Sequence, residues 1–462
     1  MRSPTPSPAQ STARQIEKKL RGELGPFLLV CIGYIAVGIK FFRFISRYSV
    51  NLFYWDHWDF ENGPLFEHHS LWEIFRWQHG PPRQGFGGVV SALVDPLFHW
   101  NSRAQAFEAG ILVLLASFCA LWLKRRLRGR IDYFDVAIPL LFLVRNQAVY
   151  FIAGANIAHG PMPLLLVVLY CLAWTLHSPK WRYLLVVVVN FLLIYTGFGL
   201  FMGVVTPLLL ASELFRDAEP AHSRRTYSLL ALLAATASLV SFFLSYRFDS
   251  ASPCFSANPH TLLPYLWFIA LMFPNFAGIK GMGLRATISG ALIGLTVLAS
   301  LIFAIKRLVT RESRDRERYF VIAALSAYAL LFCLNTAIGR ICLGIDAGQQ
   351  PRYVPYMISA FLGLYLASAT IRTSRIRAVA LSGFLLFATW CSLHLDTWTW
   401  LSARNRSRDQ RAWRECYLQR ESVQECDAIT GSKIYPSPEA THLQEKLQFL
   451  KQRRLNLYSD QR

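Results

Sequence analysis

Long apolar stretches constrain the fold of this chain more than any other feature of its sequence. Residues 163–174, 184–200 and 286–305 are apolar around the whole circumference of the helices that they would form, which a helix facing water could not sustain. A helix of about 20 apolar residues crosses the hydrocarbon core of a bilayer. These stretches therefore predict an all-α, multi-pass membrane protein, a helical bundle rather than a set of soluble domains.

Eleven stretches have the length and hydropathy expected of helices that cross a membrane. They are residues 26–45, 104–123, 134–153, 161–177, 183–197, 199–215, 228–246, 286–305, 319–337, 353–371 and 378–395. The crossings at 183–197 and 199–215 are short, and one long tilted helix is the alternative to this pair. A further apolar stretch at 262–278 is interrupted by Pro264 and Pro274, so we interpret it as a re-entrant or interfacial segment.

The distribution of positive charge indicates the orientation of the chain. The formal net charge is +20, but the basic residues lie mainly in short segments between apolar stretches. If the N-terminus is cytoplasmic, 24 of the 48 Lys and Arg residues fall in cytoplasmic segments. The tail from residue 396 carries another 12, which leaves 12 for all exoplasmic loops and membrane segments combined. This is the positive-inside pattern of a plasma-membrane protein, so the charge gives no reason to expect a nucleic-acid partner.

The predicted orientation divides the chain into three parts. Residues 1–25 form a basic cytoplasmic segment, residues 26–395 form the membrane domain, and residues 396–462 form a small exoplasmic tail domain. The first exoplasmic loop, residues 46–103, has six acidic and four basic residues, and we expect it to lie along the membrane face as short amphipathic helices. An exoplasmic tail also allows a disulfide between Cys416 and Cys426.

Two carboxylates in the first loop are the strongest candidates for chemistry. Asp56 and Asp59 stand three positions apart in the segment Tyr54-Trp55-Asp56-His57-Trp58-Asp59, so on a helix both would point the same way. At a membrane boundary one carboxylate of a pair can have a raised pKa, which suits a general base or a ligand of a divalent cation. The alternative is an interfacial belt of aromatic residues with two solvated acids beside it.

Basic residues in two other segments could bind a phosphate near this acid pair. The rigid turn Gly80-Pro81-Pro82 is expected to place His79 and Arg83 close together. Arg340 and Arg352-Tyr353 bracket a late loop at the exoplasmic boundary, where two guanidinium groups can hold a lipid-linked phosphate. A structural turn at 80–82 and the anchoring of helix ends by Arg and Tyr are the alternatives.

Asn156 and His159 form a further polar set near the outer ends of the third and fourth predicted crossings. Polar groups at that depth usually face the interior of a bundle or a cavity filled with water. We therefore include both residues among the candidates for substrate binding.

With these motifs in place, the chain resembles a broad family of bacterial multi-pass membrane proteins that look like GT-C-type glycosyltransferases. The early motifs that carry the resemblance are Asp56-His57-Trp58-Asp59, Gln78 to Arg83, and Phe98-His99-Trp100-Asn101. The late motifs are Ile338-Gly339-Arg340, Gly344, Arg352-Tyr353 and, in the tail, Ile434-Tyr435-Pro436. The likeness covers most of the chain, although each motif is short.

The resemblance implies a function and a set of partners. GT-C enzymes transfer a sugar from a polyprenyl-phosphate or polyprenyl-diphosphate donor to a glycan or lipid acceptor at the exoplasmic face of the plasma membrane, here the bacterial inner membrane. By this resemblance Asp56 or Asp59 would be the general base, Arg340 and Arg352 would bind the departing phosphate, and the anomeric centre would be inverted. Some members also use a divalent cation, so Mg²⁺ or Mn²⁺ is an open expectation.

One departure from the family pattern leaves other functions open. Where relatives have Asn-Glu-His-Arg, this chain has Gly80-Pro81-Pro82-Arg83, so a Glu and a His are absent. A protein that keeps the fold without catalysis is therefore one alternative. A transporter or flippase of lipid-linked saccharides is another, and an exoplasmic polymerase or ligase is a third.

Overall fold

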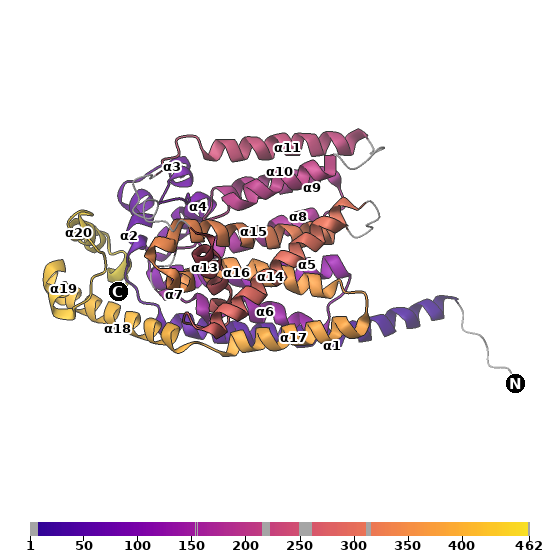
Figure 1. Cartoon of the computed structure of the whole chain (residues 1–462). Helices are drawn as coiled ribbons and strands as arrows, with labels where there is room; N and C mark the ends of the chain where they lie inside the picture. The colour runs from indigo at the N-terminus through magenta and orange to yellow at the C-terminus, as the bar shows by residue number, and fades with distance from the viewer. Residues whose placement is uncertain are drawn as a thin grey trace.

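The structure is a computed structural model, in which the protein is a bundle of α-helices (Figure 1). It describes residues 8–152, 154, 156–214, 222–248, 261–310 and 316–460, with side chains from residue 24 onward apart from those at 222 and 223. Within these ranges the β-pairing is limited to two isolated bridges, from Gln78 to Arg83 and from Arg83 to Gly197. The predicted all-α membrane bundle is confirmed.

Six helical segments are long and apolar enough to cross a membrane: Leu24–Tyr48, Ser102–Arg128, Arg224–Phe242, Leu284–Val309, Arg316–Leu343 and Ser374–Arg420. They belong to α1 (Pro8–Tyr48), α5 (Ser102–Arg128), α11 (His222–Phe242), α14 (Leu284–Val309), α15 (Arg316–Arg340), α17 (Ser374–Leu393) and α18 (Thr397–Arg420). Shorter apolar helices lie among them: α6 (Ala137–Phe142), α7 (Val149–Ile152), α8 (Pro161–Trp174), α9 (Pro179–Ile194), α10 (Leu200–Leu214), α13 (Leu262–Phe276) and α16 (Val354–Ala369).

The first loop and the tail are built from short helices. The loop contains α2 (Asp56–Phe60), α3 (Leu71–Arg76) and α4 (Gly85–Val94), and the tail adds α19 (Val423–Thr430) and α20 (Leu443–Arg453) to α18. Single 3₁₀ or π turns lie at Asn62–Phe66, Asp95–Phe98, Tyr133–Val136, Arg145–Gln147, Ile341–Leu343, Ile345–Gln349, Pro351–Tyr353 and Asn456–Tyr458.

The bundle has two chemically different ends. Helices α2, α3 and α4 gather with α18, α19 and α20 at one end, and the N-terminus lies at the other (Figure 1). We call the first of these the loop end. At the opposite end Lys124 is almost fully buried, and its Nζ lies 2.8 Å from Asp132 and 2.5 Å from Asp135. A buried ammonium requires such partners. Buried ion pairs therefore stabilise the end of the bundle that carries the basic segments between helices.

The apolar segment 134–153 is not one helix, in contrast to the sequence-based prediction. Helix α6 ends at Phe142, and a 3₁₀ turn at Arg145–Gln147 precedes α7. The side chain of Gln147 donates to the Phe142 carbonyl at 2.7 Å, that of Asn146 to the Phe276 carbonyl, and that of Arg145 to the Leu393 carbonyl. The break therefore allows Gln147 and Asn146 to satisfy backbone carbonyls inside the bundle, and Arg145 to satisfy an exposed one at the end of α17.

The segment 183–215 forms two helices, as the paired interpretation predicts. Helix α9 ends at Ile194 and α10 begins at Leu200. A Cβ atom at Gly199 would lie only 1.7 Å from the Leu193 carbonyl oxygen. Only glycine permits this close approach of the backbone, so the tight turn requires glycine at position 199.

The prolines at 264 and 274 do not interrupt α13, which runs from Leu262 to Phe276. Pro264 is the third residue of the helix, where its missing N–H has no helical acceptor, and Pro274 lies in the last turn. The prediction that these two prolines interrupt the apolar segment is therefore wrong. The 15 residues of α13 span about 22 Å, less than the roughly 30 Å of a hydrocarbon core, and a re-entrant position stays a prediction.

The first loop and the tail share one hydrophobic core, which the division of the chain into consecutive parts did not anticipate. Trp58 from α2 and Trp413 from α18 are both fully buried in it. Its other buried members are Val50, Leu52, Phe53, Leu65, Trp100, Tyr417, Val423, Cys426, Ile434, Leu443, Leu447, Leu450, Leu457 and Tyr458. In the tail, Cys416 and Cys426 form a disulfide that joins α18 to α19. Segments about 400 residues apart thus fold as one layer on the loop end.

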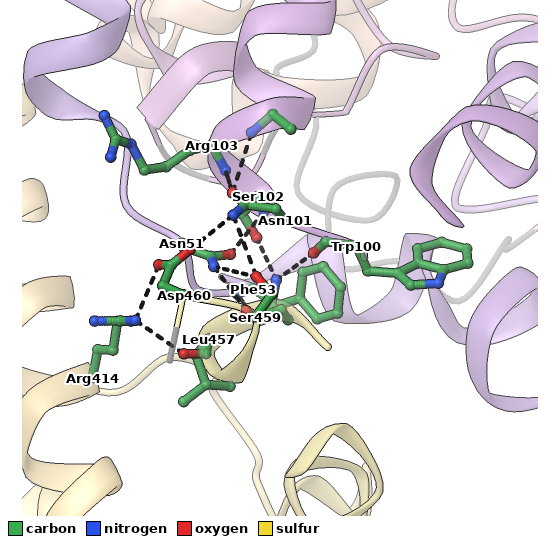
Figure 2. A network of polar contacts seen from close by, with 12 residues as sticks. Asn51, Phe53, Trp100, Asn101, Ser102, Arg103, Arg414, Leu457, Ser459 and Asp460 are labelled. Carbon is green, nitrogen blue, oxygen red and sulfur yellow. Dashed lines mark hydrogen bonds and ion pairs between the residues drawn. The ribbon is translucent and has the colours of Figure 1, made fainter. Parts of the chain in front are cut away.

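A polar network fixes the end of the tail to the base of the first loop. Figure 2 shows the side chain of Arg414 directed toward Leu457 and Asp460, with hydrogen bonds of 3.0 and 3.1 Å. Beside them the buried Asn456 donates to the Trp100 carbonyl at 2.7 Å and to the Ser102 hydroxyl at 2.8 Å. Buried polar groups that are paired in this way fix the position of the end of the tail against the base of the first loop.

Candidate functional site

The acid pair lies on a short helix whose first turn is held by the tail. Asp56 and Asp59 belong to α2, and the preceding Trp55 has φ 53° and ψ −128°. A bulky residue with positive φ is strained. The backbone N–H of Trp55 donates to the Ile434 carbonyl at 2.8 Å, so contact with the tail maintains this conformation at the start of α2.

His79 completes a cluster with the two carboxylates. One ligand atom each from Asp56, Asp59 and His79 lies within 4.8 Å of the others. The Gly-Pro-Pro turn brings His79 to this position, since the His79 N–H donates to the Pro82 carbonyl at 3.0 Å. Two carboxylates and an imidazole are suitable ligands for a divalent metal ion.

Tyr435 in the tail contacts Asp59 directly. Its hydroxyl lies 3.0 and 3.2 Å from the two carboxylate oxygens of Asp59. Burial raises the pKa of Asp59 above its ordinary value, while Tyr435 and His79 act in the opposite direction. Burial and the Asp59 carboxylate raise the pKa of Tyr435 to about 12, so the tyrosine is a hydrogen-bond donor at neutral pH. The resemblance drew attention to this residue, but its spacing from Asp59 in the sequence gave no sign of the contact.

Of two further predicted residues, His159 lies next to His79, and Arg352 lies near His159 and Tyr150. The rings of His79 and His159 are 6.5 Å apart. Burial, together with the nearby His79 and Arg352, lowers the pKa of His159, so its imidazole is neutral. The Tyr150 hydroxyl donates to the Arg352 carbonyl at 2.8 Å and lies within electrostatic range of Asp56.

The guanidinium of Arg352 is the basic group best suited to an anionic ligand. Its side chain makes no hydrogen bond or ion pair with any residue in the described ranges, and its Nε is buried without a partner. Burial of a charged hydrogen-bond donor without a protein acceptor costs free energy of folding. A phosphate would supply two acceptors in the geometry that a guanidinium requires.

Arg83 has different surroundings from those expected. It is 3% exposed, and its guanidinium donates to the carbonyls of Arg76, Phe242 and Leu244. It also lies over the Tyr195 ring, 5.7 Å from the centroid. These contacts fasten the first loop to the α9–α10 turn and the end of α11. They occupy both terminal nitrogens of the guanidinium, while its Nε is buried without a partner.

The other predicted binding residues are not brought to the acid pair by direct contacts. Asn156 accepts a hydrogen bond from the Ala158 N–H at 3.0 Å and so stabilises its own turn. Tyr353 is buried and packs against Phe332 at 5.9 Å. Arg340 ends α15, and its side chain has no hydrogen bond or ion pair within the described ranges.

A buried network behind α2 was not apparent from the sequence. Glu61 follows α2 directly and is fully buried, and the side-chain amide of Gln105 in α5 donates to it at 2.8 Å. The His57 Nε2 lies 3.3 Å from Glu61. Burial raises the pKa of Glu61 well above its ordinary value. The network joins α2 to the bundle.

Comparisons with known proteins give a limited result. No protein-family model matches the chain, and no curated protein matches it either. Among solved structures the chain is similar to an archaeal oligosaccharyltransferase from Archaeoglobus fulgidus, solved with an inhibitory peptide and a dolichol-phosphate. The identity is 15% and the TM-score 0.40, over 89% of this chain and 60% of the other. A likeness this distant carries no argument about the site.

Proposed function

We propose that this protein is a membrane glycosyltransferase that takes a sugar from a polyprenyl-phosphate-linked donor. The observation that carries the proposal is the cluster of Asp56, Asp59 and His79, together with an Arg352 guanidinium that has no hydrogen bond or ion pair within the described ranges and interacts electrostatically with His159 and Tyr150. A base and an anion-binding group at one site are what sugar transfer from a lipid phosphate requires. In this proposal the loop end faces the exoplasmic side and the N-terminus is cytoplasmic.

Asp59 is the proposed general base. It is half-buried with a raised pKa, whereas Asp56 is exposed, and a raised pKa brings a carboxylate nearer to the working pH of a base. The acceptor hydroxyl gives its proton to Asp59, and its oxygen forms a bond to the anomeric carbon. The bond from that carbon to the phosphate oxygen breaks, and the oxygen keeps the electron pair. A single displacement of this kind inverts the anomeric centre.

Arg352 is proposed to receive the charge that develops on the departing phosphate. Its fixed N–H donors cost no reorganisation when that charge appears. His159, neutral because of its burial and its basic neighbours, can donate a hydrogen bond to the same group without adding a charge. Arg340 belongs to the proposal only through the resemblance.

The cluster also fits a divalent cation. Asp56, Asp59 and His79 would hold Mg²⁺ or Mn²⁺, because their ligand atoms already lie within 4.8 Å of one another. A bound cation would supply positive charge for the donor's phosphate.

Removal of divalent cations should lower the transfer rate, and His79→Ala should weaken cation binding by at least about tenfold. Thermal unfolding of the purified protein, with and without Mn²⁺, measures the binding independently of activity. His69→Ala is the matched control, because His69 pairs with Glu67 in the same loop. A chelated protein with full activity, together with an unchanged Mn²⁺ shift in His79→Ala, would exclude the cation.

The function itself is tested with a panel of radiolabelled polyprenyl-phosphate- and polyprenyl-diphosphate-linked sugars. Membranes that contain the wild-type protein should move label into an acceptor fraction, and those with Asp56→Ala/Asp59→Ala should not. Equal transfer by both would contradict the assignment. Movement of a lipid-linked sugar across vesicles without a covalent product would favour the transporter or flippase instead.

A further inference from the structure

Six exposed arginines gather where α1 and α18 meet at the loop end. Their positions are Arg43, Arg47, Arg103, Arg404, Arg408 and Arg411. The proposed function uses none of them. We call this group the arginine face.

Contacts between the helices bring these arginines together. The guanidinium of Arg411 donates to the Arg47 carbonyl at 2.7 Å, and that of Arg103 reaches the Ser46 carbonyl at 3.4 Å. Both therefore surround the last turn of α1. On α18 the positions 404, 408 and 411 follow the spacing that places side chains on one side of a helix.

Protein carboxylates neutralise little of this charge. Within the described ranges, one member of the group has an ion pair, Arg408 with Asp409 at 3.0 Å. Arg404 instead lies over the Trp400 ring, 5.5 Å from its centroid. Several like charges on one face repel one another, and the other five arginines of the face have no ion pair with a residue in the described ranges.

Exposed apolar residues place the arginine face beside the membrane. Trp390 and Leu393 at the end of α17, and Trp398, Trp400 and Leu401 at the start of α18, are all exposed. Tryptophan in such positions marks the boundary of the hydrocarbon core. Arg404 and Arg408 lie about 5 and 10 Å beyond Leu401 along the helix, which is the depth of the lipid headgroups.

We propose that the arginine face binds the phosphates of anionic phospholipid headgroups in the leaflet at the loop end. Guanidinium groups bind phosphate bidentately, and a cluster of them next to a membrane attracts anionic lipid. The aromatic residues before the cluster hold α18 at the depth where those phosphates lie. The inference is independent of glycosyl transfer.

The test titrates full-length protein in neutral detergent with brominated phosphatidylglycerol and follows quenching of tryptophan fluorescence. Half-saturation should need about tenfold less brominated phosphatidylglycerol than brominated phosphatidylcholine. Arg404→Gln/Arg408→Gln/Arg411→Gln should reduce that preference to about twofold or less. If this variant fails to fold, Arg43→Gln/Arg47→Gln should give a comparable loss from the α1 side of the same face.

Two controls separate the site from general charge effects. Arg372→Gln/Arg375→Gln/Arg377→Gln removes the same charge from the start of α17, where the arginines lie before the crossing instead of after it, and it should keep the preference. Loss of the preference there would overturn the proposal, as would equal quenching by both lipids in the wild type. Inorganic phosphate at matched ionic strength should not displace the lipid, and displacement would assign the face to free phosphate instead.

Discussion

Replacement of Asp59 by Asn should lower the rate of sugar transfer by about 10²- to 10⁴-fold, the usual contribution of a general base. This corresponds to roughly 3–5 kcal/mol in the activation barrier. Asn has the shape of Asp and retains an oxygen that can accept from the Tyr435 hydroxyl, 3.0 Å away. The variant therefore removes the proton acceptor while leaving the contact with the tail.

Single-turnover transfer with a saturating donor measures this loss, and thermal unfolding checks that the protein remains folded. Glu415→Gln is the matched control, because Glu415 is an exposed carboxylate on α18 in the same layer, and its rate should be that of the wild type. If Asp59→Asn retains more than about a tenth of the rate while Asp56→Asn loses it, the base is Asp56. Full activity of both variants would remove the acid pair from catalysis.

The part of the site that could be predicted from the sequence depends on local spacing. Asp56 and Asp59 share one side of α2 because they are three positions apart, and a tight turn brings His79 beside them. The direction of a side chain beyond such a turn is not a local property. Arg83 follows the same turn, but carbonyls of α11 and its following turn attract its guanidinium away from the acid pair.

The break between α6 and α7 has a similar cause. Hydropathy predicts one helix over 134–153, because Arg145, Asn146 and Gln147 are outnumbered by apolar neighbours. Two of these three side chains bond to carbonyls that belong to α13 and α17. Such acceptors are defined only once the helices have packed, so a single-sequence pattern contains no signal for them.

The role of the tail was the largest feature hidden from the sequence. Its composition is ordinary, yet it supplies Tyr435 to Asp59 and the Ile434 carbonyl to Trp55. The disulfide between Cys416 and Cys426 joins the helices that carry this segment. Contacts across about 400 residues have no local sequence signature, so the dependence of the site on the tail follows only from the folded structure.

Replacement of Asn456 by Ala should detach the end of the tail from the first loop. Its side chain makes hydrogen bonds to Trp100, Ser102 and the Phe53 N–H. Removing them leaves the Trp100 carbonyl and the Phe53 N–H buried without partners, which costs about 1–3 kcal/mol for each group. Position 456 also has φ 49°, a conformation that Asn tolerates better than Ala.

The expected result is faster proteolysis of the tail and transfer slowed by roughly tenfold, the order of one lost hydrogen bond to a charged group, because Tyr435 no longer holds Asp59. Limited proteolysis followed by mass spectrometry measures the first effect, and the transfer assay the second. Asn405→Ala on the exposed side of α18 is the matched control and should change neither. A protease-sensitive tail combined with wild-type transfer would mean that Asp59 holds its position without Tyr435, and that the tail contributes stability alone.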